Sequence, residues 1–325
     1  MKRLQYYKRL LQVFSSYKRK KVRLSYLPVR LWVETTSICN LRCVMCPNKD
    51  LKKEEKGFME FGLFRKIIDE ARAFVFDVNL IHRGEGLLHP DFPRMARYAH
   101  ESGITTKFHT NATLLTEEKS VELIEAGLDQ VSFSFDGYDK KTYESIRVNA
   151  DFKKTIANIV RLLRVKQKLN SRKPYAILEL IDFPDLYKQV DSRQKQEFLK
   201  NFQGLPLNRV EVKEMHNWAG EIGAGRKTRK YSPCTFLWQA LIIFWDGSVL
   251  PCTQDFHGCY TLGNAQEMSL AEIWNNEKMV RLRTKILRQD IADLETCSRC
   301  DRLWREQILG VPREYLWKFL LKRMP

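Results

Sequence analysis

The chain has 325 residues, of which 44% are hydrophobic, and it carries a formal net charge of +17. This length is enough to bury a large core, and we expect two structural units. No run of about 18 uncharged apolar residues occurs, and the N-terminus lacks the apolar stretch and cleavage site of a secretory signal. We therefore expect a cytoplasmic protein and exclude a membrane-spanning one.

Positive charge is concentrated at the N-terminus, where residues 1–30 contain ten Lys or Arg and no Asp or Glu. A helix over residues 2–20 would place apolar side chains at steps of three and four beside these charges. These side chains are Leu4, Tyr7, Leu11 and Phe14. The pattern suits peripheral contact with the anionic inner surface of a membrane, and it suits equally a solvated helix that packs on the main domain. A nucleic-acid-binding arm fits less well.

From Val29 onward, β-rich runs alternate with amphipathic segments. We expect strands over residues 30–36, 78–83, 105–110, 130–136, 175–181 and 209–214. We expect helices near residues 60–72, 91–102, 116–126, 139–147, 152–168 and 191–201. Six strand-helix alternations predict a parallel α/β sheet, curved or closed into a partial (β/α)6 barrel, with the chemistry at the carboxyl ends of the strands.

The sequence changes character after the last of these strands. A polar, glycine-rich stretch is followed by a hairpin with Asp246 and Gly247 in its turn, a helix over residues 269–286 and a pair of cysteines. We therefore predict five segments. They are a basic N-terminal segment over 1–28, the barrel over 29–216, a linker over 217–230, a small cysteine-bearing domain over 231–310 and an amphipathic tail over 311–325.

Cys39, Cys43 and Cys46 form a C-x3-C-x2-C pattern in the loop that follows the first predicted strand. In a reducing cytosol, closely spaced cysteines indicate metal ligands rather than disulfides. Three thiolates on one loop can bind three irons of a 4Fe–4S cube and leave the fourth iron open. A structural zinc ion is the alternative, but zinc usually takes four protein ligands and no fourth Cys or His is close in sequence. The spacing favours iron–sulfur.

A second group of cysteines comprises Cys234, Cys252, Cys297 and Cys300. Two of them flank the predicted hairpin and two follow the predicted helix, so the four could converge on a second cluster. A zinc site that staples a small domain is the alternative. Cys259 is left over, and we expect it to be dispensable, because a lone cysteine is usually a small packing residue.

The first cysteine loop, CNLRCVMCP, resembles the signature of the radical S-adenosylmethionine (SAM) superfamily. Met45 stands where the family usually has an aromatic residue, and its apolar side chain serves the same covering role. The segment HRGEGLL after the second strand is similar to the family's Gly-Gly-Glu motif, with Arg83 in place of one glycine. FHTNATLL and VSFSFDGYDKKTYESIR resemble the next two strand ends, so the resemblance covers residues 30 to about 215.

This resemblance implies a set of SAM contacts at successive strand ends. Gly84 and Glu85 would receive the methionyl amino group, and Thr110 and Asn111 would line the cofactor. Ser134 would contact the ribose, and Arg147 the carboxylate or the ribose. The implied reaction is reductive cleavage of SAM to a 5′-deoxyadenosyl radical, which abstracts a hydrogen atom from a substrate.

The segments around the second cysteine group resemble the SPASM/twitch extension of radical SAM enzymes. The four-cysteine form is similar to that of 2-deoxy-scyllo-inosamine dehydrogenases, which carry one auxiliary 4Fe–4S cluster. The implied protein is a partial (β/α)6 radical SAM barrel with a small C-terminal SPASM/twitch domain. It would oxidise a small polar or carbohydrate-like substrate, with the auxiliary cluster as electron acceptor and a flavodoxin- or ferredoxin-type donor.

We assign no catalytic residue from the sequence. Candidate bases for a hydroxyl proton are Glu179, Asp182, His216 and Asp255, each of which is more often structural or solvated. One alternative function keeps the chemistry and replaces the substrate with a peptide. Another is a zinc-containing nucleic-acid-binding protein, which the basic composition would suit. The motifs that follow successive strands argue against that alternative, because a nucleic-acid-binding module does not require them.

Overall fold

The computed structural model describes residues 2–183, 191–214, 216–222, 230–308 and 311–313. The chain divides into two compact units. Unit 1 comprises Met1–Trp32, Asp69–Asp77 and His216–Pro325, and unit 2 comprises Val33–Ile68 and Val78–Met215. The five segments inferred from the sequence stay a prediction, and part of the linker (223–229) and most of the tail (314–325) lie outside the described residues.

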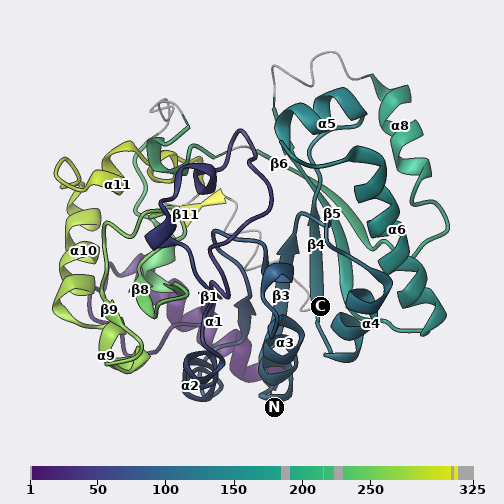
Figure 1. Ribbon diagram of the computed structural model, residues 1–325. Helices are drawn as coiled ribbons and strands as arrows, with labels where there is room; N and C mark the ends of the chain where they lie inside the picture. The colour runs from purple at the N-terminus through teal and green to yellow at the C-terminus, as the bar shows by residue number, and fades with distance from the viewer. Residues whose placement is uncertain (1, 184–190, 215, 223–229, 309–310, 314–325) are drawn as a thin grey trace. The chain divides into compact units, whose positions relative to one another are not determined.

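Unit 2 is built on a parallel sheet with strand order β6-β5-β4-β3-β2 (Figure 1). Residues of β3 pair with β4, β4 with β5 and β5 with β6, all in parallel register. The strands are β2 (Asp77–Asn79), β3 (Thr105–Thr110), β4 (Gln130–Ser134), β5 (Tyr175–Asp182) and β6 (Arg209–Glu214). The predicted α/β class and parallel sheet are therefore confirmed.

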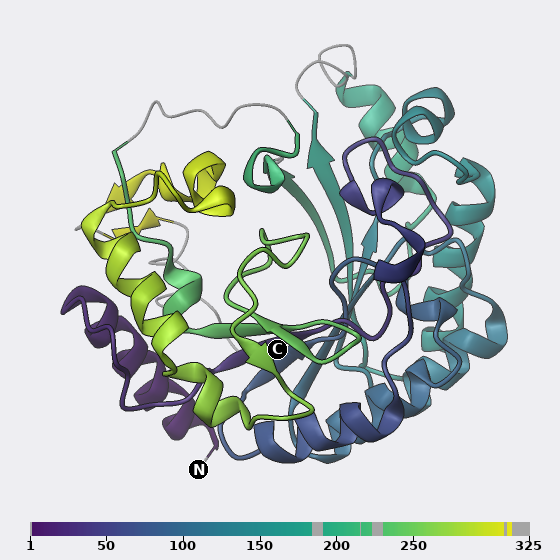
Figure 2. The ribbon, with the colours of Figure 1, turned by 60° about the vertical axis from the view of Figure 1, so that its left-hand side comes forward.

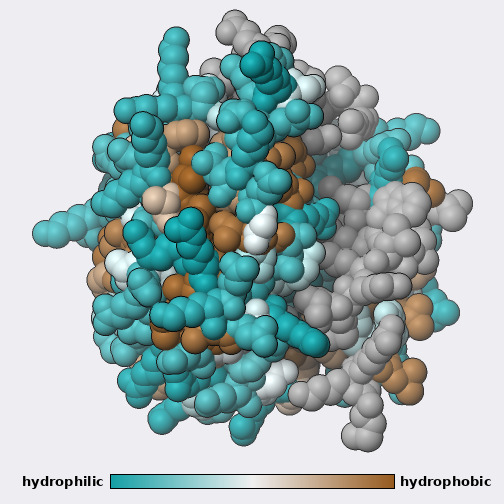
Figure 3. Space-filling model, turned by 90° about the vertical axis from the view of Figure 1, so that its right-hand side faces the viewer, coloured by the Kyte–Doolittle hydropathy of each residue, from teal (hydrophilic) through white to brown (hydrophobic). Residues whose placement is uncertain are grey.

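Helices alternate with these strands along the chain and lie along the outer side of the sheet (Figure 2). They are α2 (Phe61–Ala71), α3 (Phe92–Glu101), α4 (Glu117–Glu125), α5 (Lys140–Ile146), α6 (Phe152–Lys168) and α8 (Ser192–Lys200). Four of them begin at a side-chain oxygen that accepts a hydrogen bond from the first turn. The capping residues are Thr116, Asp139, Asp151 and Asp191. The face of the molecule shown in Figure 3 is mainly hydrophilic, with apolar side chains scattered over it.

Strand β3 shows how the sheet sorts its side chains. Its residues alternate between half-buried and buried from Thr105 to Thr110. Phe108 is fully buried and packs on Phe92 of α3, with ring centroids 4.3 Å apart. Successive side chains of a strand point to opposite faces, so His109 lies on the face away from α3. This second face is available for ligands, and below we call it the inner face.

Unit 1 contains the N-terminal helix α1 (Lys2–Lys18) and a sheet of order β1-β7-β8-β9. The strands are β1 (Arg30–Val33), β7 (Ala240–Ile243), β8 (Ser248–Leu250) and β9 (Gly263–Asn264), of which β7, β8 and β9 pair antiparallel. The remaining elements are α9 (Leu270–Trp274), α10 (Glu277–Arg288), α11 (Glu295–Arg299) and the short strands β10 (Gln307–Ile308) and β11 (Val311–Pro312). No described helix is long and apolar enough to cross a bilayer.

Several predicted elements differ from the structure. The strands predicted over 30–36 and 130–136 end at Val33 and Ser134. The helix predicted over 269–286 is two helices, α9 and α10, because the Asn276 side chain accepts a hydrogen bond from the Met279 N–H and begins a new helix. The strand predicted over 78–83 is confined to Asp77–Asn79. The chain leaves the sheet there, and the residues that follow form the site described next.

Arg283 of α10 holds the interior of unit 1 together. It is fully buried, and its guanidinium donates to the carbonyl oxygens of Leu237, Val22 and Trp274 at 2.9 to 3.0 Å. Burial lowers the pKa of Arg283 to about 9. Because Val22 precedes β1, these hydrogen bonds make the segment after α1 an integral part of unit 1.

Candidate functional site

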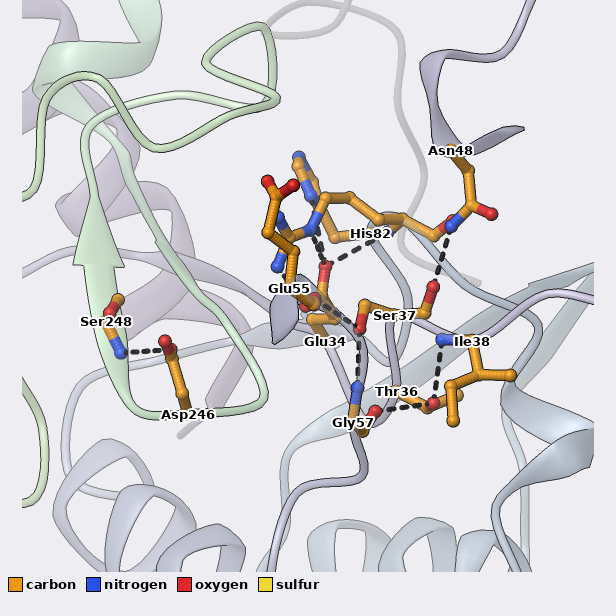
Figure 4. A network of polar contacts seen from close by, with 11 residues as sticks. Glu34, Thr36, Ser37, Ile38, Asn48, Glu55, Gly57, His82, Asp246 and Ser248 are labelled. Atoms are coloured by element: carbon orange, nitrogen blue, oxygen red, sulfur yellow. Dashed lines mark hydrogen bonds and ion pairs between the residues drawn. The ribbon is translucent and has the colours of Figure 1, made fainter. Parts of the chain in front are cut away.

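The loop that carries the first three cysteines is fixed by a buried amide. Asn48 is 4% exposed, and its Nδ2 donates to the carbonyl of Ser37 at 2.7 Å and to that of Arg83 at 2.8 Å. Figure 4 shows Asn48 and Ser37 within this polar network. One side chain thus joins the cysteine loop to the loop after β2. The two loops are held as one rigid pair.

The three thiols of this loop are largely shielded from solvent. Cys43 is 8% exposed, and Cys39 and Cys46 are half-buried. Burial raises the pKa of Cys39 to about 12 and that of Cys46 to about 11. Such thiols hold their protons at neutral pH until a metal displaces them. Among the described residues, no three Cys, His, Asp or Glu side chains converge on the position of a single metal ion. Cysteines that bind different irons of one 4Fe–4S cube lie further apart than the ligands of a single ion, so this observation is compatible with a cluster.

A buried ion pair fixes the loop that follows β2. Arg83 donates through Nε to Glu34 Oε2 at 2.7 Å and through Nη2 to Glu34 Oε1 at 2.8 Å. Glu34, labelled in Figure 4, is fully buried. Burial alone would raise the pKa of Glu34, but hydrogen bonds from Arg83 and His82 outweigh burial and lower it to about 2. Arg83, which replaces a glycine of the motif, therefore has a structural role that the sequence did not show.

Gly84 is required where this loop touches the cysteine loop. A Cβ atom on Gly84 would lie 2.2 Å from the carbonyl oxygen of Thr36 and 2.6 Å from that of Ile38. Both oxygens belong to the backbone, so neither can move aside as the end of a flexible side chain could. The next residue, Glu85, also bonds to this backbone, through its N–H to the Ile38 carbonyl at 2.8 Å.

The Glu85 carboxylate is 2% exposed and lies at the end of β3. It accepts hydrogen bonds from Thr110 Oγ1 at 2.8 Å, from the Asn111 N–H at 2.7 Å and from the Leu87 N–H at 3.2 Å. Burial raises the pKa of Glu85 despite these bonds. The structure describes no ion pair for it, and a carboxylate can accept roughly four hydrogen bonds. An incoming ammonium group would complete this site.

Thr110 and Asn111 have different surroundings. Thr110 uses its hydroxyl as a donor to Glu85 and as an acceptor from the Ala112 N–H at 3.0 Å, so its hydroxyl is occupied within the protein. Asn111 directs Nδ2 toward Cys39, 4.0 Å from its sulfur, and toward Asn40 Oδ1 at 3.0 Å. Of the two, only Asn111 presents a polar side chain to the cysteine loop.

Arg147 lies at the same loop. Its Nη1 is 3.9 Å from Cys43 Sγ, and its Nη2 donates to Asp136 Oδ2 at 2.5 Å. Burial alone would lower the pKa of Arg147, but the charge of Asp136 outweighs it and raises the pKa. Within the described chain, Arg147 Nε is buried and has no hydrogen-bonding partner. The guanidinium thus has one nitrogen near a cysteine sulfur and a second nitrogen free to donate, and a negatively charged group at the loop would bind to it.

The inner face of the sheet carries a charged cluster that the sequence did not predict. His109 Nδ1 lies 3.1 Å from Glu179 Oε2, and Lys213 Nζ lies 2.6 Å from Glu179 Oε1. Burial alone would raise the pKa of Glu179, but His109 and Lys213 outweigh it and lower the pKa. Ser134 is in register with Glu179. The sequence signal that could have identified this cluster is the period-two alternation in β3 and β5, which places His109 and Glu179 on the inner face.

The four candidate bases have different surroundings in the structure. Glu179 has a lowered pKa because of its contacts with His109 and Lys213, so it is a poor proton acceptor. Asp255 accepts hydrogen bonds from the Cys259 and Tyr260 N–H groups, both at 2.8 Å, which gives it a structural role. The His216 ring packs on Trp218, with centroids 4.4 Å apart. The side chain of Asp182 lies outside the described residues.

The second cysteine group lines a cavity in unit 1. Cys234 precedes the 3-10 helix η5 (Thr235–Trp238), Cys252 follows β8, and Cys297 and Cys300 lie in and after α11. All four line this cavity, together with Gln254, Asp255, Tyr260 and Arg302 among others. Burial raises the pKa of Cys252 and Cys297 well above the usual value, and the neighbouring cysteines raise it further. Cys259 is exposed and does not line the cavity.

These two sites define an iron–sulfur enzyme, with one cysteine set at the ends of parallel strands and another in a separate small cavity. Residues 33–171 match the family model of the Radical SAM superfamily, and residues 234–301 match that of SPASM, the iron–sulfur cluster-binding domain. The chain therefore contains a radical SAM domain and a SPASM domain. These two domains imply 4Fe–4S clusters and SAM as cofactors.

Three comparisons place the chain among its relatives. It is 29% identical over 296 residues to the tungsten-containing aldehyde ferredoxin oxidoreductase cofactor-modifying protein of Pyrococcus furiosus, covering 76% of this chain and 81% of the relative. It is 21% identical over 284 residues to the SAM-dependent 2-deoxy-scyllo-inosamine dehydrogenase of Niallia circulans, covering 83% and 92%. The crystal structure of BtrN in complex with AdoMet and 2-DOIA shares the fold, with a TM-score of 0.58, 19% identity and coverage of 90% and 97%.

Proposed function

We propose that this protein is a radical SAM oxidoreductase that oxidises a small polar or carbohydrate-like substrate. The observation that carries the proposal is the cavity lined by four cysteines in a unit other than that of the three-cysteine loop. A cluster with a full set of ligands is suited to accept an electron from the substrate. Oxidation of a C–OH group to C=O requires such an acceptor.

In this proposal, Cys39, Cys43 and Cys46 hold the SAM-binding cluster. The three thiolates leave one iron open for the amino and carboxylate groups of SAM. The bound cluster and SAM together supply the one-electron chemistry that removes a hydrogen atom from a C–H bond. The chain's own contribution is to fix the loop by Asn48 and to exclude water around it.

We assign the surrounding residues to roles that fit their contacts. Glu85 has capacity for one more donor and would receive the methionyl ammonium group beside Gly84. Arg147 and Asn111, whose nitrogen atoms approach Cys43 and Cys39, would donate toward the cluster or the SAM carboxylate. Ser134 remains the proposed ribose contact, and Thr110 acts by orienting Glu85.

We assign the proton acceptor to His109 on the inner face. Its Nδ1 is held by Glu179, which fixes the ring orientation, and in the described chain its Nε2 has no hydrogen-bonding partner. An imidazole is suited to accept a hydroxyl proton near neutral pH, and an ionised carboxylate on the other ring nitrogen stabilises the protonated form. Lys213 keeps Glu179 ionised.

The names of two relatives support a small substrate over a peptide. One relative is named for modifying a cofactor and the other for oxidising 2-deoxy-scyllo-inosamine. A peptide substrate remains the alternative within the same chemistry. An external flavodoxin- or ferredoxin-type donor would supply the electron for SAM cleavage.

Replacing Cys39, Cys43 and Cys46 together with Ala tests the proposal. We expect the anaerobically reconstituted wild type to release 5′-deoxyadenosine from SAM after reduction with dithionite, and the triple variant to release none, because no other set of three cysteines leaves an iron open. Chromatography of the nucleoside product is the measurement. Failure of the loaded wild type to form 5′-deoxyadenosine would refute the proposed function.

We also propose that α1 contacts an anionic membrane surface. Leu4 and Leu11 are 79% and 66% exposed, whereas Val13 and Tyr17 on the other side of the helix are buried. The exposed apolar residues lie beside the positive charges of this segment, and such a helix binds acidic lipid by burying its apolar face.

The double variant Leu4→Glu/Leu11→Glu is expected to lose binding to phosphatidylserine vesicles in a sedimentation assay. Its matched control is Gln5→Glu/Gln12→Glu, which changes the charge equally at exposed polar positions of the same helix. Each unit of charge near such a surface is worth about 1 kcal/mol, so the control should lose part of the binding and the leucine variant most of it. Equal binding by both variants would show that the apolar stripe has no role.

A further inference from the structure

Gln254 has an unusual position in the four-cysteine cavity. The side chain is 3% exposed and lines the cavity together with all four cysteines. In the part of the chain that the structure describes, both Nε2 and Oε1 are buried and have no hydrogen-bonding partner. A buried amide without partners is unfavourable and rare in folded proteins. Gln254 is therefore placed to bind something that enters the cavity.

The position of Gln254 in the chain places it close to a cysteine. Gln254 lies two residues after Cys252, in the loop that follows β8. The loop therefore brings a thiol and a free side-chain amide into the same cavity.

Arg302 adds a positive charge to the same cavity. Its Nε is buried without a hydrogen-bonding partner among the described residues, and its guanidinium carbon lies 4.9 Å from the ring centroid of Phe236. The positive charge of Arg302 and the N–H groups of the Gln254 amide suit a negatively charged occupant.

A cysteine-ligated cluster presents only acceptors, namely thiolate and sulfide sulfur. A glutamine amide has two N–H donors on Nε2, and rotation of the amide selects the atom that faces the acceptor. We propose that Gln254 Nε2 donates a hydrogen bond to a sulfur of the auxiliary cluster and, with Arg302, raises the reduction potential of that cluster. This inference rests on the proposed function, in which the four cysteines hold the cluster.

The physical reason is the charge of the reduced cluster. Reduction adds one negative charge, and a nearby N–H dipole or cation stabilises the reduced form more than the oxidised form. The potential therefore becomes less negative. A cluster with a less negative potential accepts an electron from a substrate more readily than a cluster in a purely apolar cavity. The presence of Gln254 therefore favours a role of the cluster as electron acceptor over a purely structural role.

A redox titration of the full-length, reconstituted protein, followed by electron paramagnetic resonance, tests the inference without any substrate. Gln254→Leu removes the donor, and we expect the auxiliary cluster to shift to a more negative potential while the SAM-binding cluster keeps its own. Gln254→Glu keeps the shape but replaces the donor with an acceptor, and we expect a larger negative shift. The control Gln239→Leu removes an amide of the same unit whose Nε2 donates to Thr235 Oγ1 and which does not line the cavity. It should leave both potentials unchanged.

A second measurement uses the wild type, so it does not require a variant that assembles its clusters correctly. Pulsed paramagnetic resonance of the reduced wild type in D2O should show an exchangeable deuteron coupled to the auxiliary cluster and to the side-chain nitrogen of labelled glutamine. Absence of that coupling, or an unchanged potential in a loaded Gln254→Leu protein, would overturn the inference. Absence of a second cluster in the wild type would instead overturn the proposed function.

Discussion

The double variant Cys297→Ala/Cys300→Ala is expected to lose about four irons per chain and still release 5′-deoxyadenosine from SAM. The reason is that the two cysteine sets lie in different units of the chain, and that SAM cleavage requires only the three-cysteine loop. Anaerobic iron analysis and quantification of the nucleoside after dithionite reduction provide the measurement. Two of four ligands are lost, so the auxiliary cluster should not assemble.

Cys259→Ser is the matched control for this variant. Cys259 is exposed and lies outside the four-cysteine cavity, so its replacement should leave the iron content unchanged. Loss of about four irons in this control would show that the auxiliary ligands are assigned wrongly.

The auxiliary cluster also staples a small unit, and its loss could unfold that unit. Circular dichroism therefore accompanies the iron analysis. A folded double variant that keeps all its iron would contradict the proposed ligand set. A folded double variant that loses iron from both clusters would contradict the independence of the two sites.

Most strands and helices of unit 2 were predictable because each has a clear local pattern. Strands 105–110 and 209–214 were predicted with the bounds that the structure gives. The helix over 152–168 was also predicted with its observed bounds, because Asp151 precedes an apolar periodicity of 17 residues. Errors occurred where a single side chain redirects the backbone, as Asn276 does between α9 and α10. A hydrogen bond of that kind leaves the hydrophobic pattern unchanged.

The site was predictable only in part. The spacing of the cysteines identifies them, because their chemistry depends on residue type and local spacing. Pairs such as His109 and Glu179, 70 residues apart in sequence, meet only through the order of the strands. The free amide of Gln254 is likewise a property of its surroundings, since a glutamine after a cysteine predicts nothing by itself. Contacts between distant segments therefore required the structure.

Arg83→Met is expected to destabilise the protein by about 3 to 5 kcal/mol, because it leaves the Glu34 carboxylate buried without its partner. Glu34 is fully buried and Arg83 is 6% exposed. Thermal unfolding of the full chain under anaerobic conditions, followed by circular dichroism, measures the change. Lys200→Met is the control, since it breaks an exposed ion pair with Glu197 and should change the stability little. Glu34→Leu/Arg83→Met should be less destabilised than Arg83→Met, because no unpaired charge remains.

The pair also makes stability depend on pH in a defined direction. The pKa of Glu34 is about 2 in the folded protein against 4.5 for an ordinary glutamate, so the unfolded chain binds more protons between these values. The contribution of Glu34 is therefore complete above about pH 4.5 and is lost as the pH falls toward about 2. In Arg83→Met the pKa of Glu34 should rise, since burial then acts without the opposing cation, and acid unfolding should begin at higher pH. An acid transition at the same pH in wild type and variant would show that this ion pair does not stabilise the loop that holds Gly84 and Glu85.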